Sequence, residues 1–142
     1  MRLSNFTDYS LRVLMYLAVK EEELSTVSEI SEKFGISYNH LIKVVHNLSK
    51  LNLISTYKGR GGGICLNASP REFNVGKIIK TLEESSLLIE CIGDKNFCRI
   101  EPVCVLKKIL VSAQESFYAT LEKFTLEDLL KNKSLLSKSL NI

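Results

Sequence analysis

Three of the four cysteines in this chain fall within one short segment, at Cys91, Cys98 and Cys104. Six residues separate the first pair and five the second, whereas structural zinc sites usually pair cysteines two to four residues apart. Zinc therefore fits this spacing poorly. Three soft thiolates without adjacent histidines suit an iron–sulfur cluster better, with the fourth ligand supplied from elsewhere in the protein.

The local sequence also favours thiolate ligands in this segment. Glu101-Pro102 is a natural helix start, because proline at the first helical position loses no needed hydrogen-bond donor. We therefore expect Cys104 in the first turn of a helix, where free N–H groups and the helix dipole stabilise an anionic sulfur. Three unrelated core cysteines are the alternative, but the intervening Gly93–Asn96 is typical of a loop.

The fourth cysteine, Cys65, lies between apolar neighbours in a strand-like segment, and we expect it to pack in the core. The N-terminal residues do not resemble a signal peptide, and no stretch approaches the ~18 apolar residues of a membrane span. We therefore expect a cytoplasmic protein that does not bind a membrane. Cytoplasmic thiols are kept reduced, which favours metal binding over disulfide formation.

Basic residues concentrate in the middle of the chain. Between positions 37 and 80 there are seven lysines and arginines and one acidic residue, although the net charge of the whole chain is only +3. Such a segment is the electrostatic footprint of a surface that binds nucleic acid. A solvated basic face would look the same, so charge alone does not decide between them.

Apolar periodicity predicts three helices at the start of the chain. The first runs from about Thr7 to Val19. Thr26 and Glu29 form a capping box that opens a short second helix, and Gly35 ends it. Ser37 is a plausible N-cap of a third helix. The inward face of this third helix consists of Leu41, Val44, Val45 and Leu48.

The segment from Val27 to Leu51 has the layout of a helix-turn-helix, although an ordinary helical hairpin would share it. Ile54–Tyr57 and Ile64–Leu66 alternate like strands, and the glycine-rich Gly59–Gly63 between them is a turn. A β-hairpin directly after a helix-turn-helix is a wing. A nucleotide-binding loop is the alternative for these glycines, but a GKS or GKT signature and a preceding βαβ pattern are missing.

DNA contacts are expected from the outer face of the third helix and from the wing. On the helix the candidates are Ser37, Tyr38, Asn39 and Lys43. In the wing, Arg60 can enter a minor groove. Asparagine can read adenine and lysine can read guanine or bind phosphate, so the base sequence is not predicted. His40 and His46 on the same helix are interpreted as surface or packing residues.

The second half of the chain contains further helices. Apolar residues over 73–82 predict a fourth helix that closes the domain. A long amphipathic helix over about 102–124 extends past any core that this small domain offers, and a two-fold dimer is the commonest way to cover such a stripe. Thr125 and Asp128 form a capping box for a short last helix. Residues 131–142 are expected to be a frayed polar tail.

The predicted fold is mainly α-helical with a small β-hairpin: a winged helix-turn-helix followed by a long C-terminal dimerisation helix. Residues 1–82 would form the DNA-binding domain, 83–104 the cluster-binding loop, and 105–142 the dimerisation helix and tail. No catalytic triad or paired-carboxylate motif is present, so we expect neither catalytic residues nor enzyme activity. A ferredoxin-like cysteine run is also missing, which argues against an iron–sulfur electron carrier.

Together these motifs resemble the Rrf family of bacterial winged-helix regulators, and within it the nitric-oxide-sensing repressors most closely. The resemblance rests on the opening Phe6–Arg12, the helix-turn-helix Val27–Leu51, the wing Gly59–Gly63 and the cysteine segment before the long helix. It covers nearly the whole chain. It implies that the three clustered cysteines ligate an iron–sulfur cluster.

The resemblance also bears on the fourth ligand. The family's regulators of iron–sulfur biogenesis carry a histidine three residues beyond the last cysteine, where this chain has Lys107. Nitric-oxide sensors of the family can use an aspartate near the N-terminus, supplied by the other subunit, and Asp8 occupies that position. From the residues alone, Asp8 is a charge favoured by the dipole of the first helical turn.

The function that the resemblance implies is repression controlled by nitric oxide. The homodimer would bind a palindromic operator in double-stranded DNA, which requires the two recognition helices to lie about one DNA turn apart. Nitrosylation of a 4Fe-4S cluster would change that spacing and so release the operator. The alternative function is a regulator with the same fold that senses redox or iron–sulfur status through a 2Fe-2S cluster.

Overall fold

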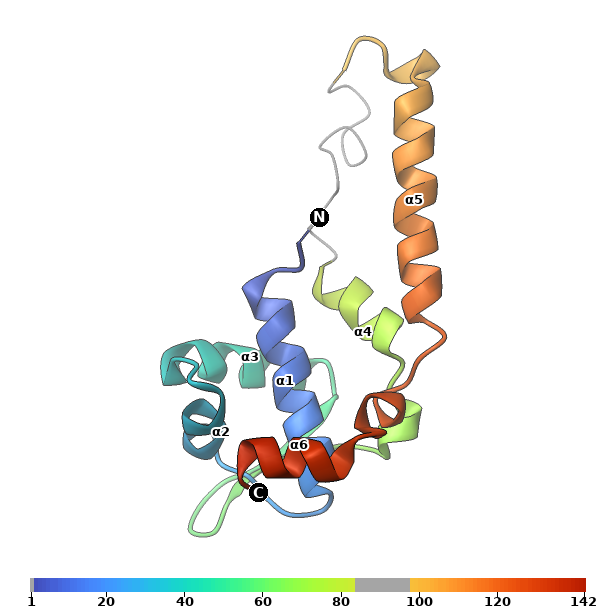
Figure 1. Ribbon diagram of the computed structural model, residues 1–142. Helices are drawn as coiled ribbons and strands as arrows, with labels where there is room; N and C mark the ends of the chain where they lie inside the picture. The colour runs from blue at the N-terminus through green and yellow to red at the C-terminus, as the bar shows by residue number, and fades with distance from the viewer. Residues whose placement is uncertain (1, 84–97) are drawn as a thin grey trace.

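Helix α1 (Asn5–Lys20) lies at the centre of the molecule's main body (Figure 1). The structure is a computed structural model that describes residues 2–83 and 98–142. The Ser4 hydroxyl caps α1 by accepting the Thr7 N–H at 3.1 Å, so the helix begins slightly before the predicted Thr7. Elements from both halves of the chain pack around α1 and bury more than one of its faces.

Helices α2 (Val27–Phe34) and α3 (Tyr38–Lys50) form the predicted helix-turn-helix. The predicted capping box of Thr26 and Glu29 opens α2, and Gly35 ends it in the left-handed conformation with φ at 61°. All four residues that were expected on the inward face of α3 are buried. Local capping and apolar spacing therefore define both helices correctly.

A buried hydrogen bond joins α1 to the start of α2. The Tyr16 hydroxyl, on a side chain with no exposed surface, donates to Glu29 Oε1 at 2.5 Å. Burial and this carboxylate acceptor both raise the pKa of Tyr16. Because the phenol stays protonated, it remains a donor and holds α2 against α1.

Strands β1 (Ile54–Tyr57) and β2 (Gly63–Leu66) pair antiparallel, with Thr56 opposite Ile64, and form the predicted wing. Ile64 is buried in the core, whereas Cys65 is only half-buried. The prediction that Cys65 packs in the core is therefore wrong. Successive residues of a strand point to opposite faces, and Ile64 takes the inward position.

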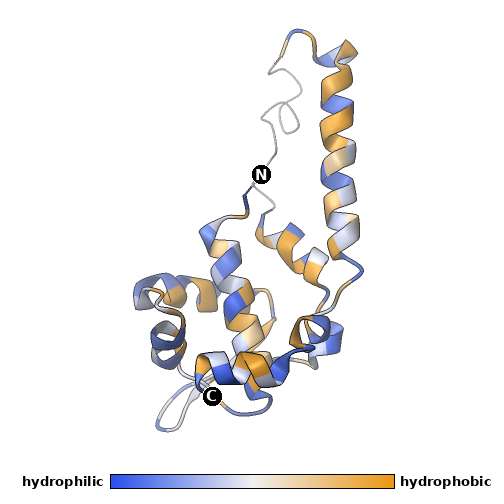
Figure 2. Cartoon of the chain, in the orientation of Figure 1, coloured by the Kyte–Doolittle hydropathy of each residue, from blue (hydrophilic) through white to orange (hydrophobic). Residues whose placement is uncertain are grey.

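The 3-10 turn η1 (Pro70–Glu72) leads into α4 (Val75–Leu82), which closes the body as predicted. Helix α5 (Val105–Leu121) packs one end against α4 and projects away from the body (Figure 1). Hydrophobic residues cover much of its projecting half (Figure 2). Three of them are more than half exposed, namely Val105, Leu106 and Ile109. Neither α5 nor any other described helix is long and apolar enough to cross a membrane.

The chain turns back towards the body at the end of α5, which stops at Leu121 rather than near the predicted Phe124. The Val75 N–H donates to the Phe124 carbonyl at 3.0 Å, and the Leu126 N–H donates to the Phe73 carbonyl at 2.8 Å. These two bonds join the segment after α5 to the start of α4. They replace the next helical turn and so end α5 early.

A short 3-10 turn, η4 (Glu127–Leu130), follows this joint. The predicted Thr125–Asp128 pair is present, since the Thr125 N–H donates to Asp128 Oδ2 at 2.9 Å and the Asp128 N–H donates to the Thr125 hydroxyl at 3.4 Å. The element there is a 3-10 turn with Leu126 at its N-cap, not the predicted short helix. The neighbouring Leu126 is 1% exposed and belongs to the hydrophobic core. The chain is therefore anchored in the body before its last segment begins.

The last segment forms helix α6 (Lys133–Leu140), so the predicted frayed tail is wrong. Leu140 and Ile142 pack against the core, and Lys33 Nζ on α2 donates to the Asn141 carbonyl at 2.9 Å. The few apolar residues of this polar segment pack against a core surface that includes α1. That surface is formed by distant parts of the chain, so the tail's own sequence does not reveal it.

Gly76 on α4 faces the end of α5 with no room for a side chain, since a methyl group there would lie 2.5 Å from the backbone nitrogen of Glu122. We predict that Gly76→Ala lowers the free energy of unfolding by about 1–3 kcal/mol, because overpacking outweighs the ~0.5–1 kcal/mol that alanine gains in a helix. Urea unfolding measures the change. Lys77→Ala, at the exposed next position, is the matched control and should lose no stability. A Gly76→Ala protein as stable as wild type would contradict this account.

Candidate DNA interface and metal centre

The start of helix α3 presents a polar surface. Ser37, Tyr38, Asn39 and Lys43 are all exposed, as expected for residues that contact a partner. Ser37 occupies the predicted N-cap position, but its hydroxyl is not used to cap the helix. The apolar residues on the other side of α3 are buried in the core, which fixes the outward direction of this surface.

Ring contacts and burial determine how the other residues of α3 lie. The rings of His40 and Tyr9 stack with their centroids 6.3 Å apart and their planes at 29°, which holds the start of α3 against α1. His40 and His46 are both exposed, and His40 also makes this ring contact with α1, so both fit the surface or packing role considered from the sequence. Ile42 is 42% exposed. The sequence alone does not reveal this exposure, because an isoleucine beside a buried stripe is interpreted as part of that stripe.

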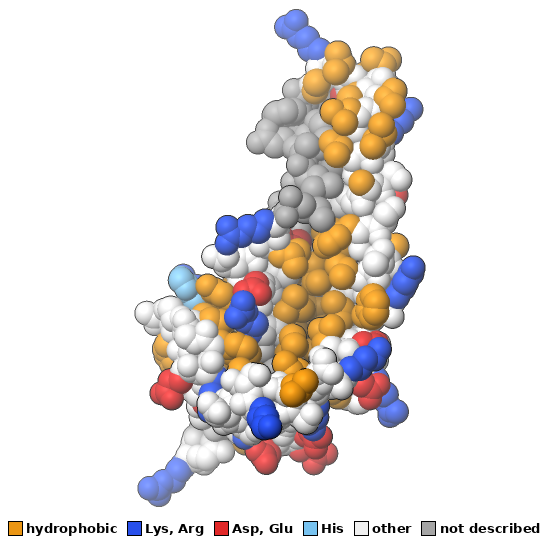
Figure 3. All heavy atoms as spheres, viewed as in Figure 1, with side chains coloured by type: hydrophobic (Ala, Val, Ile, Leu, Met, Phe, Trp, Pro, Cys, Tyr) orange, Lys and Arg blue, Asp and Glu red, His pale blue; other side chains and the backbone are white. Residues whose placement is uncertain are grey.

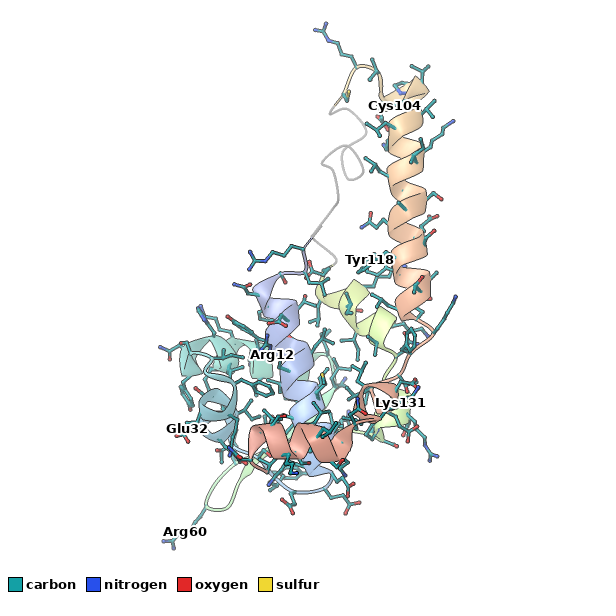
Figure 4. All side chains as sticks on the ribbon, in the orientation of Figure 1. Arg12, Glu32, Arg60, Cys104, Tyr118 and Lys131 are labelled. Atoms are coloured by element: carbon teal, nitrogen blue, oxygen red, sulfur yellow. The ribbon has the colours of Figure 1, made fainter. Side chains whose placement is uncertain are left out.

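Arg60 stands at the tip of the wing and extends away from the body (Figure 4). Gly59 and Gly61, on either side of it, have φ of 94° and 77°, a region that favours glycine. A methyl group at Gly62 would clash with the Tyr57 carbonyl oxygen. The glycines therefore serve the tight turn that presents Arg60.

The structure describes two of the three clustered cysteines, Cys98 and Cys104, and Cys91 lies outside the described residues. Both described thiols are half-buried and free. Cys104 is the N-cap of α5, and its Sγ accepts the Lys107 N–H at 3.4 Å. The prediction that Cys104 lies within the first turn is therefore wrong by one position, because η3 (Glu101–Val103) forms a separate 3-10 turn.

An ion pair braces the turn around Cys104. Lys107 Nζ lies 2.6 Å from Glu101 Oε1, and only 19% and 17% of the two side chains are exposed. The pair joins residues on both sides of Cys104 and so fixes its sulfur at the start of α5. A thiolate there accepts an N–H group and faces the positive end of the helix dipole. Cys98 and Cys104, the described members of the predicted ligand set, therefore suit an iron–sulfur cluster.

Asp8 lies in the first turn of α1, and its carboxylate is 3.0 Å from Nε of Arg12. Arg12 belongs to the body, whereas Cys104 lies at the far end of α5 (Figure 4). One chain therefore does not bring Asp8 and Cys104 together. Among the described residues, no group of three His, Cys, Asp or Glu side chains could hold a metal ion.

Arg12 also connects α1 to the helix-turn-helix. Its guanidinium carbon lies over the Phe34 ring of α2, 5.9 Å from the ring centroid. A cation above an aromatic face is attracted by the ring quadrupole. The side chain that pairs with Asp8 is therefore also in contact with α2.

A helix-turn-helix followed by a two-stranded wing defines this chain as a winged-helix protein. The model of the Rrf2 family, described as an iron-dependent transcriptional regulator, matches residues 3–132. Two relatives, from Bacillus subtilis and Halalkalibacterium halodurans, are both called HTH-type transcriptional regulator NsrR. Each is 44% identical over 144 residues, which cover 100% of this chain and 99% of the relative. The chain belongs to the Rrf2 family of transcriptional regulators.

Solved structures share the fold. The IscR structure from T. potens is similar with a TM-score of 0.74 and 26% identity, covering 93% of this chain and 88% of that chain. The oxidised form of CymR from Staphylococcus aureus gives 0.72 and 24% identity, with coverage of 92% and 97%. The predicted fold class, a mainly helical winged helix-turn-helix with a long C-terminal helix, is confirmed.

Proposed function

We propose that this chain is a homodimeric repressor whose iron–sulfur cluster responds to nitric oxide, with 4Fe-4S favoured over 2Fe-2S. The observation that carries the proposal is the position of Cys98 and Cys104 at the free end of α5, the helix whose other end is fixed to the winged-helix body. The relatives called NsrR support the same assignment. A bound cluster would supply an iron that reacts with nitric oxide.

The proposed DNA interface combines the start of α3 with the wing. The exposed polar groups on α3 suit base edges and phosphates in a major groove, since asparagine can pair with adenine and lysine with guanine or phosphate. Arg60 points away from the body (Figure 4), which suits insertion into an adjacent minor groove. The proposed contact residues are Ser37, Tyr38, Asn39, Lys43 and Arg60.

The proposed dimer would cover the projecting half of α5. Val105, Leu106 and Ile109 are 58–66% exposed there, and Val103 just before them is 77% exposed. Figure 3 shows apolar side chains gathered on this half of α5 and again over the body between α1 and α5. A two-fold axis would let each α5 cover the apolar surface of the other subunit, which is the commonest symmetry of soluble oligomers.

The proposed cluster ligands are Cys91, Cys98 and Cys104 of one subunit and Asp8 of the partner subunit. Cys104 lies at the start of the 17-residue helix α5, whose other end packs against the body that carries Asp8 of the same chain. Because a helix rises ~1.5 Å per residue, this is a span of roughly 25 Å. In a dimer in which α5 crosses to the other subunit, Cys104 of one subunit could lie next to Asp8 of the partner subunit. An oxygen ligand would leave the iron more accessible than a fourth thiolate would.

The residues next to Asp8 would connect the proposed metal centre to the proposed DNA interface through side-chain contacts. In the described state, the Asp8 carboxylate holds Arg12, which contacts Phe34 of α2, while Tyr9 stacks on His40 of α3. Moving the carboxylate to another partner releases Arg12. The start of α1 would then shift against both helices of the helix-turn-helix, and the spacing of the two recognition helices would change.

A regulator that senses iron–sulfur status through a 2Fe-2S cluster is the second candidate. The fold of IscR from T. potens, with a TM-score of 0.74, is the observation that favours it. Lys107 stands where the biogenesis regulators have a histidine ligand, and here it pairs with Glu101. Mössbauer spectra of protein purified without oxygen would distinguish the two cluster types.

Arg60→Ala is expected to weaken operator binding about tenfold, the effect of losing one groove contact. The wing tip is remote from the cysteines, so iron content should not change. Binding would be measured on a duplex that the wild-type protein selects from a random pool. Lys131→Ala removes the same charge from an exposed site away from α3 and the wing tip (Figure 4). Equal losses in the two variants would point to overall charge instead of a wing contact.

Cys98→Ala is expected to abolish both the cluster and the response to nitric oxide. The measurements are visible absorption, iron content, and gel shifts with and without nitric oxide, all on anaerobic protein. Cys65→Ala is the matched control and should keep the wild-type colour and response, because Cys65 lies in β2, which packs against α1 in the body, whereas Cys104 lies at the far end of α5 (Figure 4). Wild-type iron content in the Cys98 variant would contradict the ligand assignment. A coloured wild-type protein that holds its operator unchanged in nitric oxide would contradict the sensing function.

A mixed dimer tests whether Asp8 acts across the subunit interface. In a heterodimer of one Asp8→Ala and one Cys98→Ala subunit, ligation by Asp8 of the partner subunit leaves one site complete and the other doubly defective. We expect about half the wild-type cluster content in this heterodimer, isolated with two different tags, an unstable cluster in the Asp8→Ala homodimer and none in the Cys98→Ala homodimer. Ligation within one chain would leave a defect in each site, so a heterodimer no better than the homodimers would overturn the arrangement.

A further inference from the structure

The outer surface of α3 contains an apolar ridge next to its polar residues. Tyr38 is 49% exposed and Ile42 is 42% exposed. They are four residues apart, so they lie one above the other on the same side of the helix. Neither belongs to the hydrophobic core of the described residues or to the partly buried residues packed against it.

Neither folding nor helix formation explains an isoleucine at position 42. The core contacts of α3 are made by its buried stripe, and a β-branched residue has a lower helix propensity than the lysines and glutamates common on exposed helix faces. A single exposed apolar residue is ordinary by itself. What distinguishes Ile42 is its place, beside Asn39, Lys43 and His46 in the part of a recognition helix that enters the major groove.

The major groove itself indicates what an apolar side chain there can recognise. Base pairs present hydrogen-bond donors and acceptors along their major-groove edges, and the only apolar group among them is the C5-methyl of thymine. Asn39 and Lys43 match the polar edges. Ile42 matches the methyl group.

We propose that Ile42 is a specificity-determining residue that contacts the C5-methyl group of a thymine in each operator half-site. This assignment rests on the proposed DNA-binding function and deepens it. Ile42 would select thymine at one position through apolar contact, while its polar neighbours read or position the adjacent base pairs.

Replacing thymine by deoxyuridine removes that methyl group and leaves every hydrogen bond of the base pair in place. The wild-type protein first selects its operator from a random duplex pool, and each thymine of the selected site is then replaced singly by deoxyuridine. At one thymine in each half-site we expect an affinity loss of about fourfold, the effect of one methyl group returned to water. The other thymines should tolerate the replacement.

The variant Ile42→Ala should bind the unmodified operator several-fold more weakly and no longer respond to deoxyuridine at that thymine, because the two changes remove the same contact. Ile42→Val keeps a branched side chain and should retain most of the response. Lys43→Ala is the matched control: it should weaken binding to both duplexes and keep the ratio between them. Thermal unfolding of each variant checks that the exposed substitutions leave the fold intact.

Two outcomes would overturn the assignment. If the protein selects an operator but Ile42→Ala responds to every deoxyuridine as wild type does, Ile42 contacts no methyl group, although DNA binding stands. Unchanged operator affinity in Ile42→Ala would also overturn the assignment. The apolar ridge of Tyr38 and Ile42 would then be assigned to contact with a protein partner. A chain that selects no sequence at all would instead remove the proposed function together with this assignment.

Discussion

The close approach of α4 to the end of α5 at Gly76 determines how the two parts of this molecule are arranged. Because Gly76 has no side chain, the backbone of Glu122 reaches α4 directly. Backbone hydrogen bonds between the start of α4 and the segment after α5 then complete the joint. One end of α5 is therefore fixed, and the helix carries Cys104 away from the core.

This arrangement gives the two ends of α5 different surroundings. The fixed end joins a body in which α1, the helix-turn-helix, the wing and α6 share one hydrophobic core. At the free end, a braced turn and a capped helix start hold Cys104 among exposed apolar residues. In the proposed function, a second subunit covers that apolar surface and completes the metal centre. Signal and dimer geometry would then depend on the same interface.

The start of α1 is the place where the body could receive such a signal. Tyr9 contacts α3 through His40, and Arg12 contacts α2 through Phe34 while it pairs with Asp8. The first two turns of α1 thus contact both helices of the helix-turn-helix. Forming or breaking a polar interaction there changes the support of the helix-turn-helix, because a close-packed interior transmits strain.

Features that depend on neighbouring residues could be predicted from the sequence: the capping box before α2, the end of α2 at Gly35, the wing turn and the apolar stripe of α3. These predictions hold because caps and turns are made within a few positions of the chain. The folding of the C-terminal segment as α6, the half-buried position of Cys65 and the projection of α5, with Cys104 at its far end, away from the body emerge only from the packed molecule (Figure 4). Burial and separation depend on which distant elements pack together, and no local pattern of residues specifies that.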